Sequence, residues 1–150
     1  LTALLNKIRE RIDGVTIRTT FIAGFPGETE EEFNELCEFV EEMRFERMGC
    51  FAYSEEEGTP AARLDGMLDP EIRLERAEII NERQNAILDE INENLIGKTL
   101  EAIVEGYDAY TDSYYGRTYM DAPEIDTQIS FVCGYELEAG DIVEVEIINE

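Results

Sequence analysis

Residues 21–29 read Phe-Ile-Ala-Gly-Phe-Pro-Gly-Glu-Thr, and this stretch decides the fold of the first part of the chain. The apolar residues up to Ile22 predict a buried strand. In the following segment, 24–27, two glycines around a proline allow a tight turn and leave backbone amides uncovered by side chains. An acidic helix follows directly. Because small ligands bind at the carboxyl ends of strands in parallel α/β domains, this turn is a candidate ligand site.

The elements on either side of this turn alternate between helix and strand. Apolar residues at helical spacing predict a helix over 1–12. Thr29 and Glu32 form a predicted capping box for the acidic helix, which ends near Arg44. Residues 48–53 predict a second short strand. The order helix, strand, helix, strand is that of a parallel sheet or barrel, so this part is predicted to be α/β.

After a loop over 54–68, the pattern predicts one long helix and then an all-β region. Pro70 stands at the first helical position, and an apolar stripe runs from Ile80 to Leu95 before Gly97. At about 1.5 Å per residue this helix is roughly 40 Å long, which suits a connector between domains. Short alternating strands broken by Gly, Asp and Pro predict a small OB-like antiparallel β-barrel. We therefore predict three parts: 1–68, 69–97 and 98–150.

The charge of the chain excludes some partners. There are 36 acidic and 12 basic residues, for a net charge of −24, and the predicted barrel alone holds 13 acidic and 2 basic residues. Polyanion binding depends on Lys and Arg displacing counterions, so we expect no direct nucleic-acid binding and no binding to acidic membranes. A basic partner fits this surface, and a merely solubilising surface is the alternative.

The chain has no histidine and only three cysteines, which are Cys37, Cys50 and Cys133. The first fact excludes a histidine general base, a histidine metal ligand and a histidine-dependent nucleophile. The cysteines form no Cys-x-x-Cys pair and are predicted to be buried free thiols of a reducing compartment. With no signal peptide and no run of about 18 apolar residues, the protein is predicted to be soluble and cytoplasmic.

Two further motifs give the chain a family resemblance. Residues 51–61 read Phe-Ala-Tyr-Ser-Glu-Glu-Glu-Gly-Thr-Pro-Ala, and residues 116–126 read Gly-Arg-Thr-Tyr-Met-Asp-Ala-Pro-Glu-Ile-Asp. Together with Gly-Phe-Pro-Gly-Glu-Thr at 24–29, they resemble the radical S-adenosylmethionine methylthiotransferases. The second motif resembles the terminal TRAM domain of the RimO type, which methylthiolates an aspartate of a small-subunit ribosomal protein. The likeness implies the end of a radical-SAM partial (βα) barrel, a connector helix and a TRAM barrel.

The resemblance also implies cofactors that these residues do not supply by themselves. Members of the family use S-adenosylmethionine and two 4Fe-4S clusters. Their Cys-x-x-x-Cys-x-x-Cys motif has no match in this sequence, and three scattered cysteines do not make a cluster ligand set. We therefore expect a C-terminal fragment that is inactive alone and binds no cofactor, in which the TRAM domain stops short at its end.

The resemblance assigns a wall of the S-adenosylmethionine pocket to five residues of the turn, Gly24, Phe25, Pro26, Gly27 and Glu28. An ordinary strand-to-helix turn capped by Thr29 is the alternative. Phe51, Tyr53 and Ser54 either line the mouth of the same pocket or belong to the core and the next loop. No catalytic residue and no metal ligand is predicted in the chain.

In the TRAM region, a face of tyrosines and carboxylates suits a basic protein, because rings anchor and carboxylates pair with Lys and Arg. The alternative for the tyrosines is simple strand preference. Arg117, surrounded by acids, is predicted to make an internal ion pair. The predicted substrate-binding residues are Tyr115, Arg117, Tyr119, Asp121, Glu124 and Asp126.

The leading hypothesis is the C-terminal part of an aspartate methylthiotransferase, which completes a barrel and docks a basic small-subunit ribosomal protein of the decoding centre. A tRNA methylthiotransferase fragment is an alternative, although the negative charge argues against RNA binding. A non-enzymatic acidic adaptor that retains the architecture is the other alternative.

Overall fold

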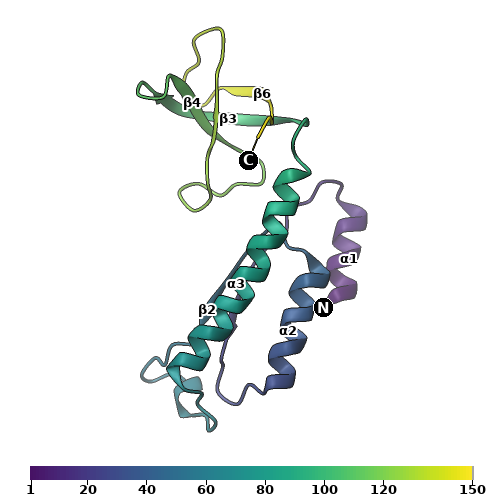
Figure 1. Cartoon of the computed structure of the whole chain (residues 1–150), viewed down its shortest axis with the longest axis vertical. Coiled ribbons are helices and arrows are strands. Elements are labelled where there is room, and N and C mark those ends of the chain that lie inside the picture. The colour runs from purple at the N-terminus through teal and green to yellow at the C-terminus, as the bar shows by residue number, and fades with distance from the viewer. Residues whose placement is uncertain (150) are drawn as a thin grey trace. The chain divides into compact units, whose positions relative to one another are not determined.

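The computed structural model describes residues 1–149 and divides the chain into two compact units, Leu1–Ile91 and Asn92–Glu150. The first unit contains three α-helices and a two-stranded sheet, and the second contains a four-stranded sheet (Figure 1). The mixed helix and sheet content agrees with the prediction. The boundary between the units falls near the end of the long helix, so most of that helix belongs to the first unit.

The first unit has the predicted alternation of helix and strand. Its elements are α1 (Thr2–Arg11), β1 (Arg18–Ala23), α2 (Glu30–Met43) and β2 (Arg47–Ala52), followed by the short 3-10 helix η1 (Ala61–Arg63) and α3 (Pro70–Glu93). The two strands are parallel, and the register runs from Arg18 opposite Arg47 to Ala23 opposite Ala52. Two strands are too few to define a barrel, so the radical-SAM barrel stays a prediction.

The ends of α2 are held by side chains. The predicted capping box is confirmed, because the Glu32 amide donates to Thr29 Oγ1 at 3.2 Å and the Thr29 amide donates to Glu32 Oε2 at 2.9 Å. At the other end Arg44 adopts the left-handed conformation with φ 46°. Arg9 of α1 donates to the carbonyl oxygens of Met43 and Arg44, which satisfies groups that the helix end leaves unpaired.

The core of the first unit lies on one face of the β1–β2 sheet. Since successive strand residues point to opposite faces, Ala23 and Cys50 face inward and Ile22 and Phe51 face outward. The inward residues pack with α2 and α3, whose buried members are Phe33, Cys37, Val40, Ala77, Ile80 and Ile87. On the outward face Ile22 and Phe51 stand opposite each other in register, 55% and 66% exposed.

The long helix α3 buries most of its predicted stripe. Ile80, Gln84 and Ile87 are buried, and Gln84 Nε2 donates to the Phe45 carbonyl at 2.8 Å. The helix ends at Glu93, four residues before Gly97, so Leu95 lies in the turn that follows. Within residues 1–149 no helix is both long and apolar enough to cross a membrane.

The second unit is an antiparallel sheet with the strand order β5-β4-β3-β6. Its strands are β3 (Thr99–Asp108), β4 (Ser113–Thr118), β5 (Ile129–Phe131) and β6 (Ile142–Glu146). The predicted alternation holds, because Ala102, Val104 and Val145 are buried. Within the described part of the chain, β5 and β6 are the two edges of this sheet. The small antiparallel sheet is thus confirmed, and its closure into a barrel stays a prediction.

Candidate cofactor-binding site

The candidate site is the turn between β1 and α2. β1 ends at Ala23, whose carbonyl accepts a hydrogen bond from the Tyr53 amide at 2.8 Å just beyond β2. Gly24 and Gly27 both have positive φ, 73° and 85°, a conformation that other residues adopt only with strain. The Gly27 amide donates to the Gly66 carbonyl at 2.8 Å. The turn is therefore tied both to the end of β2 and to the loop before α3.

Gly24 is required for a second reason, which is the close approach of α3. A Cβ atom at Gly24 would lie 2.5 Å from Arg73 Cγ and 2.9 Å from Arg73 Cα. The second of these atoms belongs to the backbone of the helix, so a side-chain rotation could not relieve the clash. The turn and the first part of α3 are consequently in direct contact at this glycine.

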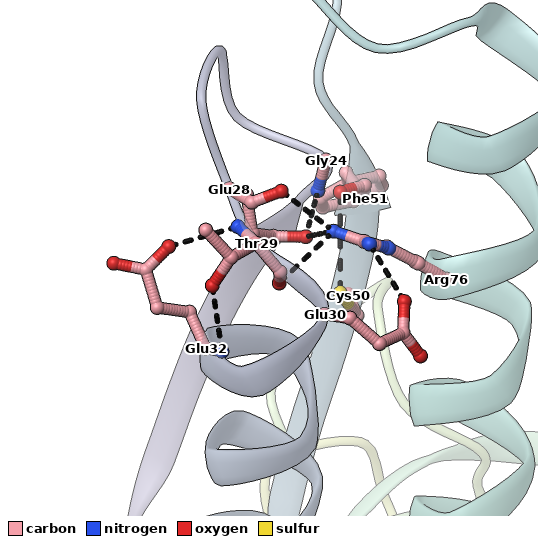
Figure 2. Close-up of polar contacts among 8 residues, drawn as sticks. All are labelled: Gly24, Glu28, Thr29, Glu30, Glu32, Cys50, Phe51 and Arg76. Carbon is pink, nitrogen blue, oxygen red and sulfur yellow. Dashed lines mark hydrogen bonds and ion pairs between the residues drawn. The ribbon is translucent and has the colours of Figure 1, made fainter. Parts of the chain in front are cut away.

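Glu28 closes the turn through a nearly buried ion pair (Figure 2). Its Oε1 atom accepts from the Gly24 amide at 2.9 Å and from Arg76 Nη1 at 2.7 Å. Arg76 also donates to the Glu28 carbonyl at 3.1 Å and, through Nη2, to Glu30 Oε2 at 3.0 Å. Its guanidinium lies 4.9 Å from the centre of the Phe33 ring. One arginine of α3 thus holds the turn and the start of α2 together.

A second arginine of α3 holds the end of β2. Arg73 Nη1 donates to the Tyr53 carbonyl at 3.0 Å, and its guanidinium lies 5.9 Å from the centre of the Tyr53 ring. The Phe25 and Tyr53 rings meet edge to face with their centres 5.3 Å apart. Tyr53 is buried, whereas Phe25 is 42% exposed and Phe51 is more exposed. Of the three predicted mouth residues, Tyr53 is thus a packing residue, and Phe51 and Ser54 are exposed.

The chemical character of this site is apolar surface and backbone rather than acid or base. Phe25 and Phe51 present exposed rings, and a Cβ atom at Gly27 would meet no atom within 4 Å. Glu28 is committed to Gly24 and Arg76. These features suit contacts to a flat, partly apolar ligand such as a nucleoside, and they offer no proton-transfer group.

Cys37 and Cys50 are buried in the core of the first unit and are not part of this exposed surface. Burial raises the pKa of the Cys50 thiol to about 11 and also raises the pKa of Cys37. Cys133 of the second unit is half-buried, and all three are free. The prediction of buried free thiols is therefore confirmed for Cys37 and Cys50. It is wrong for Cys133, which is only half-buried because it lies in an irregular segment after β5. Among residues 1–149, no group of three His, Cys, Asp or Glu residues could hold a metal ion.

The predicted substrate-binding residues of the second unit lie on β4 and in the turn after it. Tyr115 and Arg117 are on β4, and Arg117 Nε donates to Glu105 Oε1 at 2.9 Å, which confirms the predicted ion pair. Tyr119 is 63% exposed. Glu124 is exposed and has φ 61°. Tyr119 and Glu124 are exposed, whereas Tyr115 and Arg117 are half-buried. The contacts of these four residues with a substrate stay a prediction.

The two aspartates of that motif have structural contacts. Asp121 is buried, and its Oδ2 atom accepts from the Thr118 amide at 2.9 Å and from Thr118 Oγ1 at 2.6 Å. Asp126 Oδ2 accepts from the Ala122 amide at 2.6 Å. Both carboxylates therefore stabilise the turn in which they stand.

Sequence reasoning missed the residues of α3 that organise the candidate site. Arg73 and Arg76 precede the first residue of the predicted apolar stripe, Ile80, by two turns and one turn of the helix, and they continue the stripe. Asn81 of the same helix pairs with both backbone groups of Cys50, accepting at 2.9 Å and donating at 2.8 Å. Extending the stripe backwards at helical spacing would have found the two arginines. No pattern in the sequence indicates the role of Asn81.

Comparison with known proteins identifies the class of domain that ends the chain. Residues 96–150 match the TRAM domain family, so the chain consists of a mixed α/β unit followed by a TRAM domain. Proteins named ribosomal protein uS12 methylthiotransferase RimO are similar over nearly the whole chain. The protein from Clostridium botulinum strain Hall is 46% identical over 146 residues, 97% of this chain and 32% of its own length.

Other relatives with the same name agree. The protein from Carboxydothermus hydrogenoformans is 44% identical over 149 residues, and that from Clostridium novyi is 45% identical over 150 residues. Each comparison covers 99% of this chain and 34% or 33% of the relative. The chain belongs to the RimO family of methylthiotransferases, and it spans about a third of the length of the relatives it matches.

Proposed function

We propose that this chain is the C-terminal part of an enzyme that methylthiolates an aspartate of ribosomal protein uS12. The observation that carries the proposal is the 46% identity, over 97% of the chain, to a protein named ribosomal protein uS12 methylthiotransferase. In this proposal the first unit completes a radical-SAM barrel and the second unit docks the basic substrate. The chain alone is then inactive, and the tRNA-modifying and adaptor alternatives have no comparable support.

The proposed cofactor site is the turn from Gly24 to Glu28. S-adenosylmethionine supplies radical and methyl chemistry when it is bound, and the protein supplies position. The uncovered backbone of Gly27 and the exposed Phe25 ring form the surface that receives the nucleoside. Glu28 holds this surface in place through its contacts with the Gly24 amide and with Arg76. The 4Fe-4S clusters do not fit the described residues of this chain, and their ligands are expected from other parts of the full-length enzyme.

The proposed partner of the second unit is a basic protein. Residues 98–150 contain 13 acidic residues but only Lys98 and Arg117 as cations. Such a surface attracts Lys-rich and Arg-rich proteins and speeds their encounter. It lacks the cations that dominate binding to nucleic acid.

The activity is tested in a bacterial strain that lacks its own uS12 methylthiotransferase. Full-length protein that carries this chain is expressed there, and uS12 is analysed by mass spectrometry. A methylthio group on one aspartate of uS12 is expected. Unmodified uS12 together with a methylthiolated tRNA would overturn the proposal in favour of the tRNA enzyme.

The cofactor site is tested by binding of S-adenosylmethionine to the same full-length protein. Phe25→Ala removes an exposed ring from the turn, and Leu74→Ala removes a side chain that is 54% exposed on α3. Because burying an aromatic ring against a ligand contributes about 1 kcal/mol or more, Phe25→Ala is expected to weaken binding roughly fivefold or more. Leu74→Ala is expected to bind normally, and equal affinities of the two variants would place the site elsewhere.

A further inference from the structure

The second unit contains an open groove of about 1000 Å³ between the β3–β4 hairpin and the segment 132–141. Both walls are fixed by hydrogen bonds. The Leu137 amide donates to the Tyr114 hydroxyl at 3.2 Å, which holds the segment to β4. The Val104 amide donates to the Asp141 carbonyl, and the Gly140 amide donates to the Val104 carbonyl, each at 2.8 Å. The segment 132–141 is therefore held to β3 and β4, and the groove belongs to the folded structure of this unit.

Tyrosine rings form part of the lining. Tyr107 and Tyr114 have their ring centres 5.1 Å apart, and Tyr114 is stacked at 6.0 Å on Phe131 of the next strand. The Tyr107 hydroxyl donates to Asp112 in the hairpin, which fixes that ring at the rim. Tyr135 lines the opposite wall and is 66% exposed. Ring faces of this kind attract ammonium and guanidinium groups.

Carboxylates form another part of the lining and give the groove its negative charge. Asp112, Glu136, Glu138 and Asp141 line it, and no Lys or Arg is among its lining residues. The Glu136 and Glu138 side chains make no ion pair with any cation of the described chain. Arg117, one of two cations in residues 98–150, is already paired with Glu105. The groove thus combines negative charge with aromatic rings and no internal counter-charge.

We propose that this groove binds an extended protein segment rich in Lys and Arg, with cationic side chains held between the tyrosine rings and Glu136 or Glu138. The identity of the protein that carries the segment rests on the proposed function, while the binding chemistry rests on the groove alone. The site is different from the predicted substrate residues, because Arg117, Tyr119 and the aspartates lie at the other end of β4. A single-stranded nucleic acid would also stack on tyrosines, but its phosphates would face four carboxylates.

The test is a fluorescence-anisotropy titration of the 150-residue chain with a labelled 12-residue peptide of alternating Arg and Gly, at physiological salt. The matched peptide has citrulline in place of arginine, which keeps the shape and removes the charge. The groove variant is Glu136→Gln with Glu138→Gln. The control variant is Glu101→Gln with Glu144→Gln, which removes the same charge from two exposed residues that face each other on β3 and β6.

Binding of the arginine peptide and no binding of the citrulline peptide are expected. Loss of two close charges should weaken binding about fivefold or more in the groove variant and less than twofold in the control. Tyr135→Ala should weaken it about threefold, and Tyr135→Phe should restore it, because the ring rather than the hydroxyl attracts the cation. Equal losses in the groove and control variants would overturn the proposal, as would tighter binding of a single-stranded RNA of equal length.

Failure of this proposal and failure of the proposed function have different signatures. If full-length protein modifies uS12 while the groove variant binds and modifies it normally, the groove proposal is wrong and the function stands. If the groove binds the arginine peptide as described and uS12 gains no methylthio group, the groove stands and the proposed function is wrong.

Discussion

Arg76 Nη1 of α3 lies 2.7 Å from Glu28 Oε1 at the end of the glycine–proline turn, although the two residues are 48 positions apart. Both side chains are nearly buried, 9% and 12% exposed. Glu28 in turn accepts from the Gly24 amide (Figure 2). This pair therefore connects the long helix to the backbone of the candidate cofactor site.

Arg76→Ala should destabilise the first unit by roughly 3 kcal/mol, because it leaves the Glu28 carboxylate without its counter-charge in a poorly solvated place. Arg83 pairs with Glu41 at the surface and is the control, since an exposed pair contributes less than about 1 kcal/mol. Urea unfolding followed by circular dichroism measures both. Equal losses for Arg76→Ala and Arg83→Ala would contradict the special role of the buried pair.

The two glycines of the turn should respond differently to substitution. Gly27→Ala introduces strain of about 1–2 kcal/mol from its positive φ, but its Cβ meets no neighbour. Gly24→Ala adds to the same strain a contact of 2.9 Å with the Arg73 backbone. We expect a larger loss of thermal stability for Gly24→Ala, by several degrees. Melting temperatures that agree within a degree would show that α3 moves away without cost.

Local contacts explain what could be predicted from the sequence. The capping box joins Thr29 to Glu32, three residues away, and the strand alternation requires only neighbouring residues. The contacts that organise the site join distant segments, as between Arg76 and Glu28 or between Asn81 and Cys50. Nothing in the sequence states which polar residue of a helix faces a strand edge. The assigned site residues and the barrels stay predictions.

Asn81 acts as a substitute for a neighbouring strand. It accepts from the Cys50 amide and donates to the Cys50 carbonyl, so it satisfies both backbone groups of Cys50 on the edge of β2 that faces away from β1. Asn81→Ala should cost about 2 kcal/mol, because it leaves two partly buried groups unpaired. Asn85→Ala, at an exposed position one turn later, is the control. Hydrogen exchange of the Cys50 amide should accelerate in Asn81→Ala and not in Asn85→Ala, and equal protection would contradict this role.

The cysteines should differ in reactivity because the thiolate is the nucleophile. Burial raises the pKa of Cys50 from 9.0 to about 11, so at pH 8 the folded protein holds it as an unreactive thiol. Iodoacetamide should modify Cys133 first and Cys50 only after unfolding, which peptide mass spectrometry measures.

The same shift has a consequence for stability. Between pH 9 and about 11, the unfolded chain loses the Cys50 proton and the folded chain keeps it. The contribution of this thiol is therefore fully present below pH 9 and is lost as the pH rises through that window. Cys50→Ala should show a shallower decline of stability than the original chain over this range, and parallel declines would contradict the assignment.

The aspartates of the TRAM motif should behave as structural residues. Asp121 accepts two hydrogen bonds from Thr118, so Asp121→Ala leaves a buried amide and hydroxyl without this acceptor and should cost about 2 kcal/mol. Glu124→Ala removes a carboxylate of the same motif from an exposed position and should change stability by less than about 0.5 kcal/mol. Thermal unfolding of the chain measures the difference. If Asp121→Ala is as stable as Glu124→Ala, the Asp121 carboxylate is not needed to hold the turn.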